Sequence, residues 1–287
     1  MAFDVRAGSP DMLGPVHVFP GDEHTVPETY RRVIFSGYIS SVATVLGGAQ
    51  GYGLTIDPVT FERWKRIGAA AGLLDTFLDE SPDPDHASAL YDQGLSLAFD
   101  DRSDPRPPDW VDGRLEPAVR LLRNSVRSLP AHLIEALFDS SKFIGRAVLG
   151  KARCTYVRDY VRLLKLEAFH SSRLIHGSAS DDVRGQAGFS EFQRWCTNSL
   201  QLATLLDSTW DLWADNRSGR TGVPASMLNS MRIAIHGYRP YRALTRPRRN
   251  RRATLSAIVS RCRFSLLPTT MAMRHHTPRV GPAAAGR

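Results

Sequence analysis

The hydrophobic and polar positions of this chain repeat mostly at helical spacing, with apolar residues three and four apart. Segments of this kind predict helices at 27–46, 58–80, 114–128, 130–149, 153–177 and 189–215. Asp57 and Pro58 indicate where the second helix begins, because aspartate caps a helix and proline is tolerated at its first position. Strand-like alternation and hairpin dipeptides are nearly absent. The pattern therefore predicts an all-α protein.

Glycine, proline and polar clusters divide these segments. We expect the first helix to break at Gly47-Gly48 and at Gly51-Tyr52-Gly53, because glycine is a poor helix former. Polar loops are predicted at 81–84 and 100–113. The chain then divides into three parts, namely an irregular lead-in (1–27), an all-α domain (28–240) and a C-terminal extension (241–287).

Composition and charge narrow the class of protein. With 287 residues, 42% hydrophobic and 23% charged, the chain resembles an ordinary soluble globular protein. Its formal net charge of +8 arises from arginines clustered in the C-terminal extension, which its prolines predict to be partly disordered. Three isolated cysteines argue against a disulfide scaffold or a zinc module. Without a signal peptide or an apolar membrane span in view, we expect a cytoplasmic protein.

Two short stretches carry the candidate chemistry. LLDTFLDE contains Asp75 and Asp79, and DLWADNRSGRTGVP contains Asp211 and Asp215. A spacing of four places each pair on one helix face, where like charges repel. Such pairs occur on solvated surfaces or where a cation holds them together, and the surrounding leucines and aromatic residues favour the second reading. Asp207 and Glu80 extend the two pairs, and whether either binds metal stays open.

DLWADNRSGRTGVP resembles the second aspartate-rich motif of squalene and phytoene synthases, D-x-x-x-D-x-x-x-G-R-x-x-x-P. Five residues fall in register, namely Asp211, Asp215, Gly219, Arg220 and Pro224. LLDTFLDE resembles the first motif of that family, and the 136 residues from Asp75 to Asp211 are similar to its motif separation. The resemblance covers about residues 60–225. It implies the helical bundle of the isoprenoid synthase type.

The resemblance also implies the chemistry. Asp75, Asp79, Asp211 and Asp215 are expected to be the catalytic, metal-binding residues, holding Mg²⁺, with Mn²⁺ as an alternative. The metal would neutralise the diphosphate leaving group of a prenyl diphosphate. Other residues are expected to bind substrate, either as phosphate ligands or as cavity walls; these are Arg220, Arg173, Lys165, Tyr160, Phe77 and Trp210.

One departure from the family favours a single substrate. Lys165 and Leu166 replace the Ala-Gly step of the family, and we expect their bulk to exclude a second prenyl chain. The leading hypothesis is therefore a class I terpene synthase. Its substrate would be a C15 or C20 prenyl diphosphate, or a bicyclic C20 diphosphate supplied by a partner class II cyclase. Head-to-head condensation, as in squalene and phytoene synthases, is the alternative.

A third hypothesis belongs to another class of function. The run RPRRNRR at 246–252 could neutralise nucleic-acid phosphates, but no recognition module accompanies it, so no nucleic-acid partner is expected. The same basic tail is suited to contact anionic membrane surfaces, where long-chain substrates reside.

Overall fold

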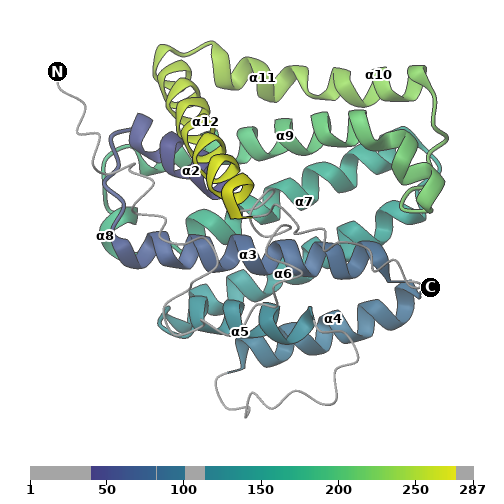
Figure 1. The fold of residues 1–287 in the computed structure, drawn as a ribbon, viewed down its shortest axis with the longest axis horizontal. Coiled ribbons are helices and arrows are strands. Elements are labelled where there is room, and N and C mark those ends of the chain that lie inside the picture. Colours follow the sequence, from purple (N-terminus) through teal and green to yellow (C-terminus); the bar gives the residue numbers. More distant parts are fainter. Residues whose placement is uncertain (1–39, 82, 101–113, 276–287) are drawn as a thin grey trace, which may run out of the picture.

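The computed structural model describes residues 40–81, 83–100 and 114–275, and Figure 1 shows the arrangement of their helices. Within these ranges all regular structure is helical and no strand is present. The predicted all-α class is therefore confirmed. The predicted lead-in at 1–27 and most of the loop predicted at 100–113 lie outside the described residues. No described helix combines the length and apolar character needed to cross a membrane.

The helices follow one another through short connections. The first half of the chain forms α2 (Ser40–Gly51), α3 (Pro58–Glu80), α4 (Pro84–Phe99), α5 (Leu115–Val126) and α6 (Ala131–Ala152). The second half forms α7 (Val157–Gly177), α8 (Asp181–Arg184), α9 (Phe189–Ser218), α10 (Met227–His236), α11 (Tyr238–Thr245) and α12 (Arg248–His275). In Figure 1, α10 and α11 lie along the upper edge, α4 and α5 along the lower one, and α3, α7 and α9 between them.

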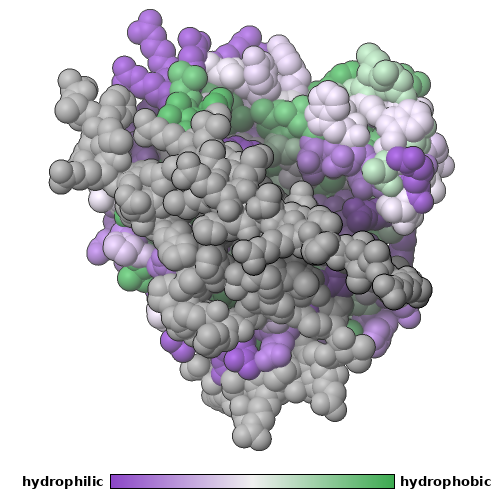
Figure 2. Space-filling view, viewed as in Figure 1, coloured by the Kyte–Doolittle hydropathy of each residue, from purple (hydrophilic) through white to green (hydrophobic). Residues whose placement is uncertain are grey.

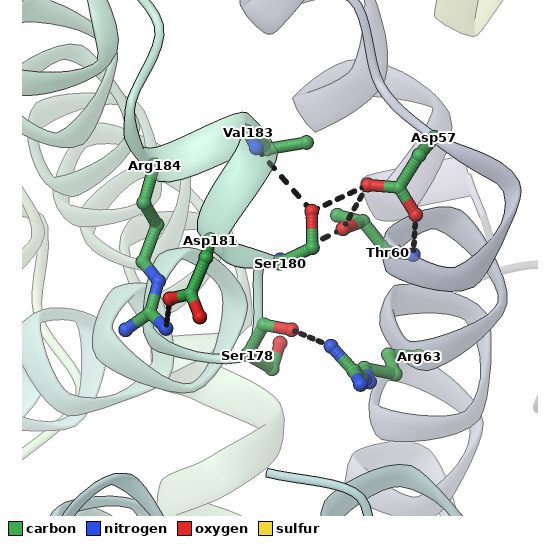
Figure 3. Close-up of polar contacts among 8 residues, drawn as sticks. All are labelled: Asp57, Thr60, Arg63, Ser178, Ser180, Asp181, Val183 and Arg184. Carbon is green, nitrogen blue, oxygen red and sulfur yellow. Dashed lines mark hydrogen bonds and ion pairs between the residues drawn. The ribbon is translucent and has the colours of Figure 1, made fainter. Parts of the chain in front are cut away.

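Helix α3 is anchored at its first turn, as Figure 3 shows. The Asp57 carboxylate accepts hydrogen bonds from the Thr60 amide (2.8 Å), the Thr60 hydroxyl (2.7 Å) and the Ser180 hydroxyl (2.6 Å). Ser180 is the N-cap residue of α8, so one carboxylate caps α3 and joins two helix starts. Arg63, one turn further along α3, donates to the Ser178 carbonyl (3.3 Å). These bonds fix the position and rotation of α3 relative to the end of α7.

The core is built from aromatic residues of α3 and α9. Trp64 of α3 is stacked on Phe192 of α9, with ring centroids 6.0 Å apart, and Phe192 is stacked on Trp195 at 6.2 Å. All three side chains are fully buried. The Trp64 indole N–H donates to the Ile175 carbonyl (2.7 Å), which ties α3 to α7 as well. The three long helices that carry the candidate site are thus held together at one end by a rigid aromatic core.

Helix α2 does not break at Gly47 and Gly48 as the sequence predicts, but continues to Gly51. The glycines are required for close packing instead. A Cβ atom at Gly48 would lie 2.0 Å from the Trp195 ring, and one at Gly51 would lie 2.3 Å from the Cα of Ala253. The backbone of α2 therefore approaches α9 and α12 more closely than any side chain would allow. This packing compensates for the low helix propensity of glycine.

Helices follow the domain boundary predicted at residue 240. Most of residues 241–275 lie in α11 and α12, and α12 crosses α2 (Figure 1), where Ala253 and Ala257 are buried. The Ser260 hydroxyl donates to the Ala43 carbonyl (2.8 Å), and the Trp195 indole donates to Thr254 (3.1 Å). This part of the presumed extension is an integral helix of the body. Residues 276–287 lie outside the described range.

Candidate functional site

The C-terminal ends of α3 and α9 lie on either side of a pocket of about 260 Å³. Asp79 of the first DxxxD motif and Asp215 of the second both line it, although they are far apart in the sequence. Helix α6 contributes the opposite wall and α7 contributes Tyr160. The complete lining is Leu78, Asp79, Ser81, Val148, Leu149, Lys151, Ala152, Tyr160, Asp215, Ser218, Gly219 and Arg220. The two motifs therefore meet at one place, and Arg220 lies there with them.

Arg220 connects the two motifs directly. Its guanidinium Nη1 lies 3.3 Å from the Asp79 carboxylate and 3.9 Å from that of Asp215. The turn that aims it starts at Gly219, whose φ of 77° ends α9 in the left-handed conformation that favours glycine. The Arg220 amide then donates to the Asp215 carbonyl (2.9 Å). The Gly-Arg step thus turns the chain at the end of α9 so that its side chain reaches α3.

The carboxylates of this site are poorly compensated. Burial and the nearby charge of Asp75 together raise the pKa of Asp79 to about 6, against the opposing effect of Arg220. Burial also raises the pKa of Asp215, with Asp211 and Asp207 adding to the shift while Arg220 and Lys151 oppose it. The pKa of Asp207 is likewise raised by burial and by the charges of Asp211 and Asp75. In each case the charges of neighbouring carboxylates therefore contribute to a raised pKa.

Two residues that the sequence analysis did not identify complete the cluster. Lys151 at the end of α6 forms an ion pair of 3.0 Å with Glu167 of α7, and both side chains are largely buried. Burial alone would lower the pKa of Lys151, but Glu167 and Asp75 outweigh it, so the pKa rises and the ammonium stays charged. The signal that could have identified them is a charge within an apolar helical stretch, AVLGKA for Lys151 and LLKLEAF for Glu167.

Tyr160, predicted to bind substrate, lies in this pocket. It is buried near the start of α7 and hydrogen-bonds to Ser208 of α9. Burial raises the pKa of its hydroxyl, which therefore stays protonated at neutral pH, although Lys151 acts in the opposite direction. Tyr160 lies seven residues before Glu167, about two helical turns, so both belong to the face of α7 that looks onto the cluster. That phenol can donate one hydrogen bond into the pocket.

The structure does not bring Lys165 or Arg173 to the aspartates. Lys165 lies on the side of α7 that faces α10, where its charge lowers the pKa of His236 together with burial. The Arg173 guanidinium lies over the Phe169 ring, 6.0 Å from its centroid, and its charge acts on His170 and His176. Both cations therefore belong to other surfaces of α7.

Neither of the two expected cavity walls lines the pocket. Phe77 is 2% exposed and lies in the hydrophobic core, with the Arg114 guanidinium 5.6 Å from its ring centroid. Trp210 is 80% exposed and points into solvent. Phe77 lies between the carboxylates of its DxxxD pair and Trp210 directly precedes its pair, but each can face away from the carboxylates, since each helical step turns a residue by about 100°. Proximity in sequence was therefore a poor guide to these two positions.

The expected exclusion of a second prenyl chain loses its structural basis. The bulk of Lys165 and Leu166 could exclude a second chain only by filling the pocket. Leu166 is instead exposed at the surface, and Lys165 faces α10. On α7, Tyr160 lines the pocket with Asp79 and Asp215, and Glu167 interacts electrostatically with Asp75 and Asp207. Whether the enzyme uses one substrate or condenses two must therefore be decided from the carbon number of the product.

The donor chemistry of the site fits a hard divalent cation, although the metal-binding arrangement is not ready-made. Carboxylate oxygens are the ligands that Mg²⁺ prefers. The carboxylates that act on one another's pKa are Asp75, Asp79, Glu167, Asp207, Asp211 and Asp215, and the cations that act on them are Lys151, Arg220 and Arg261. Counted over the described residues, the cluster therefore has more negative than positive charges. Among the described residues, however, no three His, Cys, Asp or Glu side chains converge closely enough to hold a metal ion.

Comparison with known protein families finds no family model that matches this chain, and no curated protein matches it either.

Proposed function

We propose that this protein is a Mg²⁺-dependent class I terpene synthase of the isoprenoid synthase type. It would ionise a C15 or C20 prenyl diphosphate, or a bicyclic diterpenyl diphosphate, to a terpene hydrocarbon or alcohol plus diphosphate. One observation carries the proposal: Asp79 and Asp215, from two DxxxD motifs, line one pocket and share one arginine. A chance pair of solvated carboxylate faces would have no reason to meet.

The excess of negative charge supports a cation-dependent reaction. Bound at Asp75, Asp79, Asp211 and Asp215, Mg²⁺ would supply Lewis-acid neutralisation of the diphosphate. Asp79, with a pKa near 6, is mostly ionised at neutral pH and would be available as a ligand for a divalent cation. The carboxylates would then no longer hold Arg220, and its guanidinium could donate to the diphosphate.

The remaining groups of the pocket have roles that follow from their charge. In the ionisation, the C–O bond to the diphosphate breaks and the electron pair leaves with the oxygen. Lys151, kept cationic by Glu167, adds a fixed positive charge on the side of α6. Tyr160, which stays protonated, can donate to an oxygen of the leaving group. The allylic cation would then lose a proton or take up water.

The direct test is product formation. Purified protein is incubated with farnesyl, geranylgeranyl and copalyl diphosphate in Mg²⁺, and released diphosphate and product mass are measured. We expect a product with the carbon number of its substrate, and none in EDTA. Turnover that persists without metal would refute the mechanism. A C30 or C40 product would instead assign the chain to head-to-head condensation.

Substitutions locate the activity. Asp75→Asn, Asp79→Asn, Asp211→Asn and Asp215→Asn should each lower the rate about 10²-fold or more, the usual scale for losing one electrostatic contact to a developing charge. Asp139→Asn, at an exposed position on α6, is the matched control and should keep the full rate. If the four variants stay folded by circular dichroism and also keep the full rate, the aspartates are not catalytic.

A further inference from the structure

The charge of this chain changes abruptly after Asp215. Residues 216–287 contain fifteen arginines, no lysine and none of the chain's 29 acidic residues. The first 215 residues hold the other 22 basic residues against all 29 acidic ones. The chain thus has an acidic body and a wholly basic C-terminal quarter. Because the positive charges are separated from the acidic residues in this way, the basic quarter is suited to bind an anionic partner.

The basic quarter is not a separate tail, because most of it forms the edge of the helical body. Helices α10 and α11 and the start of α12 follow one another along the upper edge in Figure 1. Figure 2 shows hydrophilic and hydrophobic residues side by side over this edge. Its exposed arginines are Arg232, Arg239, Arg246, Arg248, Arg249, Arg251 and Arg252. We call this surface the basic edge.

The same edge carries large apolar side chains in contact with water. Met227, Met231 and Ile235 recur at every fourth residue of α10, so they form one stripe along its outer face. Met227 is 73% exposed and Ile235 is 68% exposed, whereas Ile233 on the inner face is fully buried. Tyr238 and Tyr241 of α11 continue the exposed stripe. A stripe of this size on a soluble surface indicates an interaction site.

A hollow of about 700 Å³ opens at the start of α12. Arg248, Arg249, Arg251 and Arg252 line it together with Tyr52 and Leu255. Arg249 is paired with Glu191 (3.6 Å). Within the described part of the chain, no ion pair to the other three is formed. Arg251 donates to the Thr245 carbonyl (3.3 Å). The hollow therefore presents the guanidinium groups of Arg248 and Arg252 beside an apolar side chain, and it is wide enough for a phosphate-bearing headgroup.

We propose that the basic edge binds the surface of an anionic lipid bilayer. Arginines beside exposed aliphatic and tyrosine side chains match the two layers of a membrane interface, since headgroup phosphates take the guanidinium groups and the acyl boundary takes the apolar stripe. Nucleic acid would use the arginines alone, because its backbone offers nothing to Met227, Met231 or Ile235. The inference goes beyond the proposed reaction and is tested by binding alone.

The test measures co-sedimentation of the full chain with phosphatidylcholine vesicles and with mixed phosphatidylcholine–phosphatidylglycerol vesicles. We expect binding to the mixed vesicles only, weakening as salt is raised. Arg248→Gln/Arg252→Gln should weaken it about thirty-fold, since each arginine near an anionic surface contributes on the order of 1 kcal/mol. Met231→Ser/Ile235→Ser should weaken it about ten-fold or more, at unchanged charge.

Two matched controls make the result specific. Arg153→Gln/Arg158→Gln removes two exposed arginines elsewhere, and Val59→Ser/Tyr156→Ser removes two exposed apolar side chains elsewhere. Both should bind like the wild type. Equal binding to both kinds of vesicle, or unchanged binding by the edge variants, would overturn the proposal. The proposal would also be overturned if the protein did not bind either kind of vesicle but bound duplex DNA or RNA through Arg248 and Arg252. That result would assign the basic edge to nucleic acid.

Discussion

The two ends of helix α3 place aspartates in opposite electrostatic situations. At the first end, burial would raise the pKa of Asp57, but hydrogen bonds from Ser180 and Thr60 outweigh it and lower the pKa. At the other end, burial and Asp75 raise the pKa of Asp79 to about 6, and Arg220 compensates only in part. The N-terminal end of a helix also favours negative charge, whereas the C-terminal end disfavours it.

This difference distinguishes an aspartate that holds the fold from one that the fold merely tolerates. Asp57 accepts hydrogen bonds from the Thr60 amide and from the Thr60 and Ser180 hydroxyls, and so joins α3 to α8 (Figure 3). Asp79 is kept in a place where its charge is unfavourable, together with other carboxylates in the same situation. Proteins accept such a cost where activity depends on it. The direction of the pKa shift therefore separates the two roles on one helix.

Among the charged residues, the largest effect on stability is expected at Lys151, the cation that stabilises the acidic end of α3. Lys151→Met should lower the free energy of unfolding by about 3 kcal/mol, because it leaves Glu167 buried without its partner. Chemical denaturation measures this loss. The double variant Lys151→Met/Glu167→Gln should recover most of it.

The control is an exposed ion pair. Arg153→Met removes the partner of Asp85, and since both side chains are in water the change should stay within about 0.5 kcal/mol. If Lys151→Met were as mild as this control, the buried pair would have no part in holding α6 and α7 together at the site.

At the first end of α3, Asp57→Ala should lower the free energy of unfolding by about 1–2 kcal/mol at pH 7, because a helix cap and a bond between helices are both lost. A lowered pKa means that the carboxylate stabilises the fold when ionised. The difference from wild type should therefore shrink as pH falls through that pKa. Asp83→Ala, which removes only the cap of α4, should cost less. Equal losses would mean that the Ser180 bond contributes nothing.

At the other end, Asp79→Asn should raise the melting temperature by a few degrees at pH 8 in metal-free buffer. A pKa raised from 3.8 to about 6 means that the folded state prefers the neutral form, so ionisation above pH 6 destabilises it. The gain should vanish near pH 4, where the wild-type carboxyl is itself protonated. Calorimetry at both pH values measures it, and a variant less stable at pH 8 would contradict the assignment.

The smallest effect is expected at Trp210. Since its side chain is in water, Trp210→Ala should change the free energy of unfolding by no more than about 0.5 kcal/mol. Trp195→Ala on the same helix should cost about 3–5 kcal/mol, because that ring is buried between α2 and α12. A large loss at Trp210 would show that its surface is covered in solution.

Local patterns gave good predictions where one helix face decided the outcome. The start of α3 at Pro58 and its end at Glu80 followed from the capping residues and the prolines, and α9 followed from its apolar period. Helix α4 was not predicted, although its inward face carries Ala87, Tyr91, Leu95 and Ala98 at helical spacing. Prolines on either side of its start and a glycine within it interrupt the apolar pattern in the sequence.

The remaining differences arise from contacts between distant segments. The sequence predicts a helix break at Gly47 and Gly48. In the structure these glycines stay helical because α12 and Trp195 pack directly against them. The arginine-rich segment was predicted to be an extension, but Ala253 and Ala257 in it are buried against α2. At the site, the spacing of the aspartates predicted two pairs, but the pairing of Lys151 with Glu167 depends on how α6 lies against α7. No local pattern encodes that packing.

The close packing of α2 on α12 has a consequence for synthesis. Ala43 and Ser260, which share a hydrogen bond, are 217 residues apart in the sequence. At a ribosomal rate of about 5–20 residues per second, α2 must wait roughly 10–40 s for its partner to be made. During that interval its glycine face is uncovered and available to chaperones or to the α12 helix of a neighbouring chain. The order in which the nascent chain emerges therefore leaves the closing of this fold to its last helix.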